Sequence, residues 1–109
     1  SPLAKRLPNN PKYVERFQLV VKGAELCNAF SELSDPVDQE NRFKEQTLLK
    51  NQGDSEAFEA DADFVEALKY GLPPTAGLGL GIDRLIMVLG NVDNIKEVIM
   101  FPTMRPKKD

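Results

Sequence analysis

Three glycines and an arginine in the last third of the chain form its clearest candidate for chemistry. Residues 77–84 read Gly-Leu-Gly-Leu-Gly-Ile-Asp-Arg. Side chains alternate along a strand, so Gly77, Gly79 and Gly81 share one face, and we expect Leu78, Leu80 and Ile82 to pack in the core. Glycine in a strand interior costs about 0.5–1 kcal/mol relative to alanine. A flat ligand against the bare face and close packing of another chain segment explain the glycines equally well.

Arg84 favours the ligand, because it follows the glycines into the first turn of a helix, where the macrodipole disfavours a cation. A planar guanidinium suits both stacking on an aromatic base and contact with phosphate oxygens. The spacing is not the dinucleotide-binding fingerprint, since the last glycine and a surrounding βαβ unit are missing. A surface arginine paired with Asp83 or with a nearby glutamate is the alternative interpretation.

A second group of candidate residues lies between Glu25 and Glu32. Asn28, Phe30 and Glu32 have the same strand parity, and an amide, a ring and a carboxylate together suit the wall of a pocket for a cationic substrate. Glu25 has the opposite parity and joins them only if a bulge intervenes or if the site wraps around the end of the strand. Solvated or ion-paired carboxylates are the alternative.

The elements that position these residues begin with a strand pair. Alternating apolar residues from Val14 to Val21 predict a half-buried strand that contains Phe17 and Leu19, and Lys22-Gly23 predicts a turn. A second strand is expected over residues 24–33, antiparallel to the first. Residues 1–13 contain three prolines and an Asn pair, which predicts a loop.

The remaining patterns predict mainly helices. Asp35-Pro36 begins a surface helix that ends near residues 51–53, and Asp61 or Asp63 caps a shorter helix that ends at Gly71. The apolar residues expected on these two helices are Val37, Phe43, Leu48 and Leu49, then Phe64, Val65 and Leu68. Further on we expect a strand at 75–82, a helix at 83–89 capped by Gly90, a helical turn at 94–97, a strand at 98–101 and a polar tail at 102–109. This order predicts an α+β fold, an antiparallel sheet flanked by helices.

Composition narrows the classes of function. The 109 residues carry 14 basic and 17 acidic side chains, so a net charge of −3 gives no electrostatic footprint for nucleic acid or anionic membrane. The sequence has no histidine, which excludes Ser-His-Asp catalysis and His-ligated metals within it. Cys27 is the one cysteine, so no internal disulfide is expected. No apolar run approaches the roughly 20 residues of a membrane span, and the opening residues predict a piece of a longer protein.

Several segments together strongly resemble the C-terminal part of class II lysyl-tRNA synthetases. They are Glu25–Pro36, Gly71–Gly77 and Gly79–Leu85, within a resemblance that covers nearly the whole chain. Gly81–Arg84 is similar to the third signature motif of class II synthetases, at residues 77–90. The Asn-Ala-Phe-Ser-Glu run is what makes the resemblance specific for lysine. Residues 1–109 are then expected to be one part of the catalytic domain, without the first two motifs and without the anticodon-binding domain.

The resemblance implies ATP-dependent activation of lysine to lysyl-adenylate and transfer to tRNA(Lys), in a cytoplasmic homodimeric enzyme without a membrane. It implies that the catalytic Arg84 stacks on adenine and that Glu25 holds Mg²⁺. It further implies ATP binding by Arg84, Asn28, Glu25, Gly79 and Gly81, and lysine binding by Glu32, Phe30, Asn28 and Gly77. No general base is expected, because the substrate carboxylate is itself the nucleophile.

One position departs from the family pattern, and two other functions remain open. Gln18 stands where the family normally has a second Mg²⁺-binding glutamate, which places that metal contact in doubt. One alternative is a relative that attaches a lysine-like group to a translation elongation factor. The other is a binding or regulatory segment without catalysis. In every case we expect this chain alone to be a poor catalyst.

Overall fold

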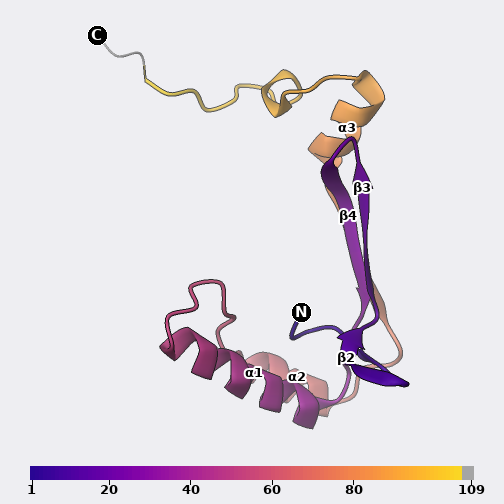
Figure 1. Cartoon of the computed structure of the whole chain (residues 1–109), viewed down its shortest axis with the longest axis vertical. Helices are drawn as coiled ribbons and strands as arrows, with labels where there is room; N and C mark the ends of the chain where they lie inside the picture. The colour runs from indigo at the N-terminus through magenta and orange to yellow at the C-terminus, as the bar shows by residue number, and fades with distance from the viewer. Residues whose placement is uncertain (107–109) are drawn as a thin grey trace. The chain divides into compact units, whose positions relative to one another are not determined.

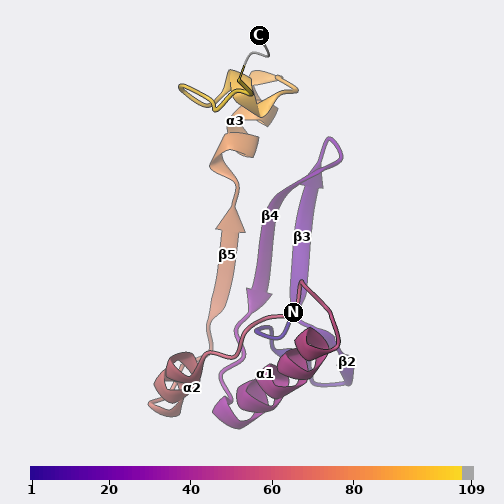
Figure 2. The ribbon, with the colours of Figure 1, turned by 90° about the vertical axis from the view of Figure 1, so that its left-hand side faces the viewer.

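The computed structural model describes residues 1–106, so the end of the predicted polar tail lies outside the described residues. The elements in chain order are β1 (Arg6–Leu7), β2 (Asn10–Val14), β3 (Arg16–Val21), β4 (Ala24–Ser31), α1 (Pro36–Asn51), α2 (Ala62–Lys69), β5 (Ala76–Leu80), α3 (Ile82–Gly90) and the 3₁₀ helix η1 (Ile95–Glu97). Strands β1 and β2 form one sheet, and a second sheet has the order β3-β4-β5 (Figure 2). Antiparallel sheets with helices confirm the α+β prediction.

The chain divides into two compact units. Unit 1 comprises residues 1–17 and 29–77, and unit 2 comprises residues 18–28 and 78–109. Strands β3, β4 and β5 each contribute residues to both units. Among residues 1–106, none of the helices combines the length and apolar character that crossing a bilayer requires.

Unit 1 opens with a short antiparallel hairpin where we expected a loop. Arg6 pairs with Val14 and Leu7 with Asn10, so the loop prediction was wrong for these residues. The prolines are compatible with the pairing because Pro8 falls in the turn and Pro11 occupies a strand of a two-stranded sheet, where a missing donor is tolerated.

The helices of unit 1 begin at the predicted caps. Asp35 accepts hydrogen bonds from the backbone of Val37 and Asp38 at 2.8 and 3.3 Å, and Asp61, not Asp63, caps α2 through Phe64 at 2.9 Å. Helices α1 and α2 lie side by side (Figure 1). The rings of Phe43 and Phe64 make an edge contact between them. Phe43, Val65 and Leu68 are buried, whereas the predicted apolar residues Val37, Leu48 and Leu49 are exposed. The apolar stripe of α1 is therefore narrower than predicted.

The segment before the hairpin packs tightly into unit 1. Ala4 is fully buried, and the backbone of residues 3–5 pairs with residues 31–33, through Lys5 to Ser31 at 2.8 Å and Leu33 to Leu3 at 3.0 Å. Strand β4 ends at Ser31, two residues earlier than predicted, because Glu32 makes only an isolated bridge to Ala4.

Unit 2 contains a tight turn and a helix that ends one residue later than expected. Lys22 and Gly23 have φ values of 50° and 77°, which confirms the predicted turn. Helix α3 includes Gly90, and the left-handed residue that caps it is Asn91 at φ 51°, so the prediction of a Gly90 cap was wrong. Asparagine tolerates this region through its short polar side chain.

Two other predictions for this part of the chain were also wrong. Residues 98–101 form bends and turns, because an apolar run becomes a strand only beside a partner and none of the described strands pairs with it. Leu78, Leu80 and Ile82 are 64%, 42% and 60% exposed, and so are not core residues. The alternation predicted the strand correctly, but nothing among the described residues of unit 2 covers its leucine face. In unit 1, Phe17 is likewise 58% exposed.

Candidate functional site

The glycine face in unit 2 continues directly into helix α3. Gly81 donates its N–H to the carbonyl of Leu26 at 3.0 Å, and its own carbonyl accepts from Leu85 at 2.9 Å as the helix begins. Gly79 is exposed, and a side chain there would first meet the backbone oxygen of Asn28, at 3.9 Å. The face is therefore open surface, and the chain's own hydrophobic groups do not fill it at this position.

Arg84 lies at the start of the same helix and reaches back to β4. Its Nη1 donates a hydrogen bond to the backbone carbonyl of Glu25, while the residue as a whole remains exposed. The structure thus brings Arg84 close to the backbone of one of the predicted ATP-binding residues. The pairing with Asp83 that we considered is not the contact recorded here.

Glu25 is half-buried and is hydrogen-bonded to Gln18, the residue that departs from the family pattern. The Gln18 Nε2 donates a hydrogen bond to Oε2 of Glu25. No group of three or more acidic, histidine or cysteine side chains within residues 1–106 is arranged to hold a metal ion. A single carboxylate still fits Mg²⁺, because that ion commonly binds one or two carboxylates together with substrate phosphates and waters.

A small pocket in unit 2 lies beside Arg84. It has a volume of 140 Å³, and apolar side chains such as Val21, Leu26 and Met87 form most of its wall. Pockets that enclose small-molecule ligands measure roughly 300–1,000 Å³. The described residues of unit 2 therefore offer an open surface for a flat ring with a guanidinium beside it, and the small pocket is below the size that encloses a ligand.

The remaining predicted residues, Phe30, Glu32 and Gly77, belong to unit 1. Phe30 and Glu32 are both half-buried. The backbone N–H of Glu32 donates to the carbonyl of Thr75 at 2.9 Å, and its carboxylate lies where a side chain on Gly77 would be. The structure thus brings Glu32 and Gly77 together. Asn28, assigned by resemblance to both substrates, belongs to unit 2.

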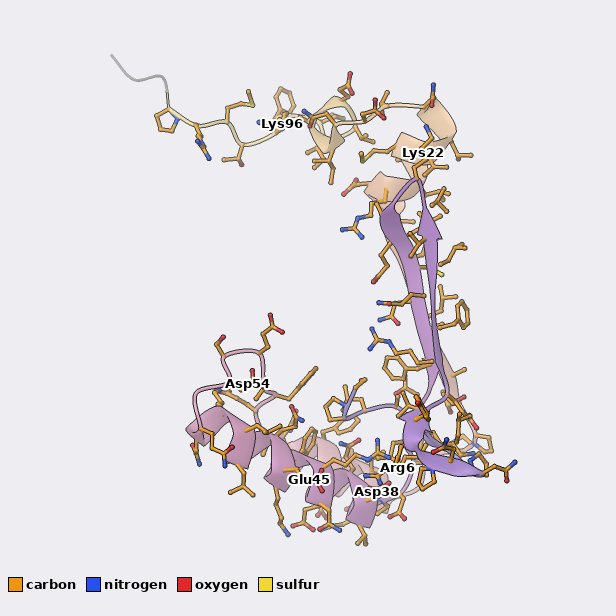
Figure 3. All side chains as sticks on the ribbon, in the orientation of Figure 1. Arg6, Lys22, Asp38, Glu45, Asp54 and Lys96 are labelled. Atoms are coloured by element: carbon orange, nitrogen blue, oxygen red, sulfur yellow. The ribbon has the colours of Figure 1, made fainter. Side chains whose placement is uncertain are left out.

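A cluster of charged residues in unit 1 was missed by the sequence reasoning. Arg42 is only 5% exposed and donates hydrogen bonds to both carboxylate oxygens of Asp38, at 3.1 and 2.9 Å, and to the carbonyl of Ala4 at 2.6 Å. Arg6 adds a longer ion pair to Asp38 at 3.9 Å (Figure 3). The hydrogen bonds from Arg42, with the charges of Arg42 and Arg6, outweigh partial burial and hold the pKa of Asp38 below its ordinary value. The four-residue spacing of Asp38 and Arg42 was the available signal.

Gln39 completes this polar part of the interior. It is fully buried, its Nε2 donates to the carbonyl of Pro2 at 3.1 Å, and its Oε1 has no hydrogen-bond partner. Together, Gln39 and Arg42 hold the first residues of the chain against α1. This arrangement is structural, because both side chains are used to satisfy backbone carbonyls.

A pocket in unit 1 that is larger than the one beside Arg84 contains none of the predicted site residues. It has a volume of 610 Å³, lies between α1 and α2, and is lined by side chains such as Phe43, Leu48 and Val65. The charges at its margin include Glu66 and Lys69, which pair with each other at 2.8 Å. The pocket is mainly apolar and lacks a convergent set of reactive groups, so its size does not make it the active-site candidate.

Comparisons with known proteins agree on one family. The family model described as tRNA synthetases class II (D, K and N) matches residues 1–105. The chain is 56% identical over 109 residues, all of its length, to a lysine–tRNA ligase of Chloroflexus aurantiacus, and covers 22% of that protein. It is 56% identical over 108 residues to the lysine–tRNA ligase of Mycoplasma capricolum and 55% identical over 108 residues to that of Aquifex aeolicus, 99% of the chain in both cases, covering 22% and 18% of those proteins. The chain spans about a fifth of the length of these relatives.

Proposed function

Because the chain belongs to the family of class II tRNA synthetases (D, K and N), we propose that it is part of the catalytic domain of a lysine–tRNA ligase. The observation that carries the proposal is its identity of more than half, over essentially its full length, to proteins named for that activity. The enzyme activates lysine with ATP to lysyl-adenylate and then transfers the lysyl group to tRNA(Lys).

Unit 2 supplies the nucleotide-binding residues in this proposal. Gly79 and Gly81 leave a face without side chains on which the adenine can lie, and Arg84 stacks on the ring and contacts a phosphate. The hydrogen bond of Arg84 to the Glu25 backbone supports this role, because it keeps the guanidinium beside the glycine face. Asn28 contributes a polar group next to Gly79.

Mg²⁺ is held by Glu25 together with the phosphates of ATP. The ion would neutralise part of the negative charge on the phosphates. Gln18 offers an amide in place of a second carboxylate, so the protein provides one anionic ligand here. We therefore propose a weaker metal contact than two carboxylates would give.

Unit 1 supplies the recognition of lysine. The carboxylate of Glu32 binds the ε-ammonium of the substrate, and Phe30 and Gly77 border its aliphatic stem. A half-buried carboxylate suits this role, because partial removal from water strengthens the pairing of opposite charges.

The first reaction needs no general base from the protein. The lysine carboxylate attacks the α-phosphorus of ATP, and pyrophosphate leaves with the bonding electrons. The residues position the two substrates and stabilise the charge that develops on the phosphates. A sequence without histidine is compatible with this chemistry.

We also propose the location, oligomeric state and partners that the resemblance implies. The enzyme is a cytoplasmic homodimer whose partners are lysine and tRNA(Lys), without a membrane. The anticodon-binding domain and the remainder of the catalytic domain lie in the larger part of the enzyme that this chain does not represent.

The test is to place this chain into a working relative. The 109 residues replace the matching segment of the Chloroflexus aurantiacus ligase, with which they share 56% identity. We expect the chimera to catalyse lysine-dependent exchange between ATP and pyrophosphate and to charge tRNA(Lys). Arg84→Ala in the chimera should lower the exchange rate at least about 100-fold, because it removes a cation that contacts the reacting phosphates.

The controls separate the alternatives. The parental ligase and the folded chimera are measured side by side, with lysine and with β-lysine as a lysine-like substrate. Exchange with β-lysine only would favour the relative that modifies an elongation factor. A folded chimera without any exchange, beside an active parent, would support a binding segment and would overturn the catalytic proposal.

A further inference from the structure

In unit 1, the carboxylate of Glu32 lies next to Gly77, in the space where a side chain at position 77 would be. A Cβ built on Gly77 would overlap Oε1 of Glu32 and would lie 3.6 Å from its carboxyl carbon. The carboxylate therefore lies in the volume that any other residue at position 77 would fill. Because Gly77 has no side chain, the carboxylate of Glu32 can lie in this place.

The backbone of Glu32 cannot move away to relieve such an overlap. Its N–H donates to Thr75 at 2.9 Å, it bridges to Ala4, and the next residue, Leu33, donates to Leu3 at 3.0 Å. Ala4 is fully buried. Since these contacts hold the backbone of Glu32 from both sides, its carboxylate can move away from an overlap by rotation about the side-chain bonds.

The other glycines of the same strand and helix do not impose such a requirement. A Cβ on Gly79 would meet nothing closer than 3.9 Å, and one on Gly90 would meet nothing within 4 Å. The steric demand at Gly77 is therefore a property of this one pair of residues. It is not a general consequence of packing against β5.

We propose that Gly77 is a specificity-determining positioning residue, which fixes the Glu32 carboxylate where it receives the primary ammonium group of the substrate. The inference rests on the proposed function, because it concerns the recognition of lysine. An alanine at position 77 forces the carboxylate oxygen aside until it is in ordinary van der Waals contact with the new methyl group. Misplacement of about 1 Å costs on the order of 100-fold in an oriented reaction.

This role can be separated from a role in folding. The atom displaced by Gly77→Ala is the end of a flexible side chain, and the backbone conformation at Gly77 is not in the left-handed region. The substitution should therefore leave the urea midpoint of the chain unchanged. In the chimera it should raise the KM for lysine about 10- to 100-fold, with a smaller change in kcat and none in the KM for ATP. Gly90→Ala is the matched control and should change none of these values.

A double-mutant cycle tests whether Gly77 acts through Glu32. In the Glu32→Gln background, adding Gly77→Ala should change the KM for lysine less than about twofold, because the charge that it displaces is already gone. Equal effects of Gly77→Ala in both backgrounds would overturn the inference. An unchanged KM for lysine in the Gly77→Ala variant would also overturn the inference. The proposed function would stand in that case if the unsubstituted chimera is active. An inactive but folded unsubstituted chimera would instead overturn the proposed function, and the inference with it.

Discussion

The two units of the chain differ in how much of their apolar surface they bury. Unit 1 has six buried hydrophobic residues around α1, α2 and the first residues of the chain, together with buried Gln39 and Arg42. Among the described residues of unit 2, Leu26 and Cys27 alone are buried. Helix α3 is rich in apolar residues and buries none completely, although an amphipathic helix normally covers its apolar stripe.

This difference follows the division of the proposed roles. Glu32 and Gly77, which we propose to recognise an ammonium group, belong to the unit with the better packed interior. Gly79, Gly81 and Arg84 belong to the unit that leaves its surfaces open. A carboxylate that must discriminate one substrate needs rigid support within about 0.5 Å, whereas a flat ring needs mainly an accessible face. The packing of each unit therefore matches the precision that its proposed task requires.

The largest expected effect is loss of the aromatic core of unit 1. Phe43 is 5% exposed and makes an edge contact with Phe64 at 6.3 Å between ring centroids. Phe43→Ala should lower the free energy of unfolding by about 3–5 kcal/mol, measured by urea denaturation. Phe101→Ala in unit 2 is the matched control, because Phe101 is 94% exposed and should cost less than about 0.5 kcal/mol. Similar losses in both variants would contradict the contrast between the units.

A smaller effect is expected from the buried cation. Arg42→Met removes the hydrogen bonds to Asp38 and Ala4 while keeping the aliphatic volume. We expect a loss of about 2–3 kcal/mol in the free energy of unfolding, because the carbonyl of the buried Ala4 is left without its donor. Lys44→Met is the control, since its pair with Glu40 is exposed and should contribute less than about 0.5 kcal/mol. If Lys44→Met were the costlier change, the polar interior of unit 1 would not be stabilising the fold.

Much of the fold was predictable because its signals are local. The Asp35-Pro36 cap and the Lys22-Gly23 turn each place an element through neighbours in sequence and were predicted correctly, whereas the cap of α2 was predicted only as Asp61 or Asp63. The bridge between Ala4 and Glu32 depends on residues far apart in sequence, and it was not predicted. The same reason explains the buried Gln39 and Arg42, whose partners are backbone carbonyls of residues 2 and 4.

The candidate site was predictable in its residue types and less so in its contacts. Alternation placed Gly77, Gly79 and Gly81 on one strand face, but it could not tell that a side chain at Gly77 would overlap the Glu32 carboxylate, whereas one at Gly81 would make only an ordinary contact with Arg84. Nor could it tell that Arg84 would bond a backbone carbonyl. The catalytic and binding roles themselves stay predictions.

A still smaller effect concerns pH, through Asp38. Its folded-state pKa is lowered, chiefly by the hydrogen bonds from Arg42, so the folded protein takes up this proton less readily than the unfolded chain. The stability it contributes is present above its ordinary pKa of 3.8 and is lost as the pH falls through the lowered value. The free energy of unfolding of the native chain, minus that of Asp38→Asn, should be constant from about pH 7 to pH 5 and then shrink in acid. Parallel curves for the two proteins down to acid pH would show that Arg42 does not favour the ionised carboxylate.

The smallest effect on stability, and the one most informative about unit 2, is expected from Gln18→Glu. This change replaces the hydrogen bond between Gln18 and Glu25 by two facing carboxylates, so without metal it should cost up to about 1 kcal/mol of unfolding free energy. Mg²⁺ should reverse that loss, because two carboxylates bind the ion better than one, and the chimera should need less Mg²⁺ for half-maximal exchange. Gln18→Met removes the same hydrogen bond without adding charge, so it should be destabilised without any response to Mg²⁺. If Gln18→Glu responds to the ion no more than the native chain does, Glu25 does not hold the metal, and the nucleotide site that we propose on unit 2 has no metal contact from this strand pair.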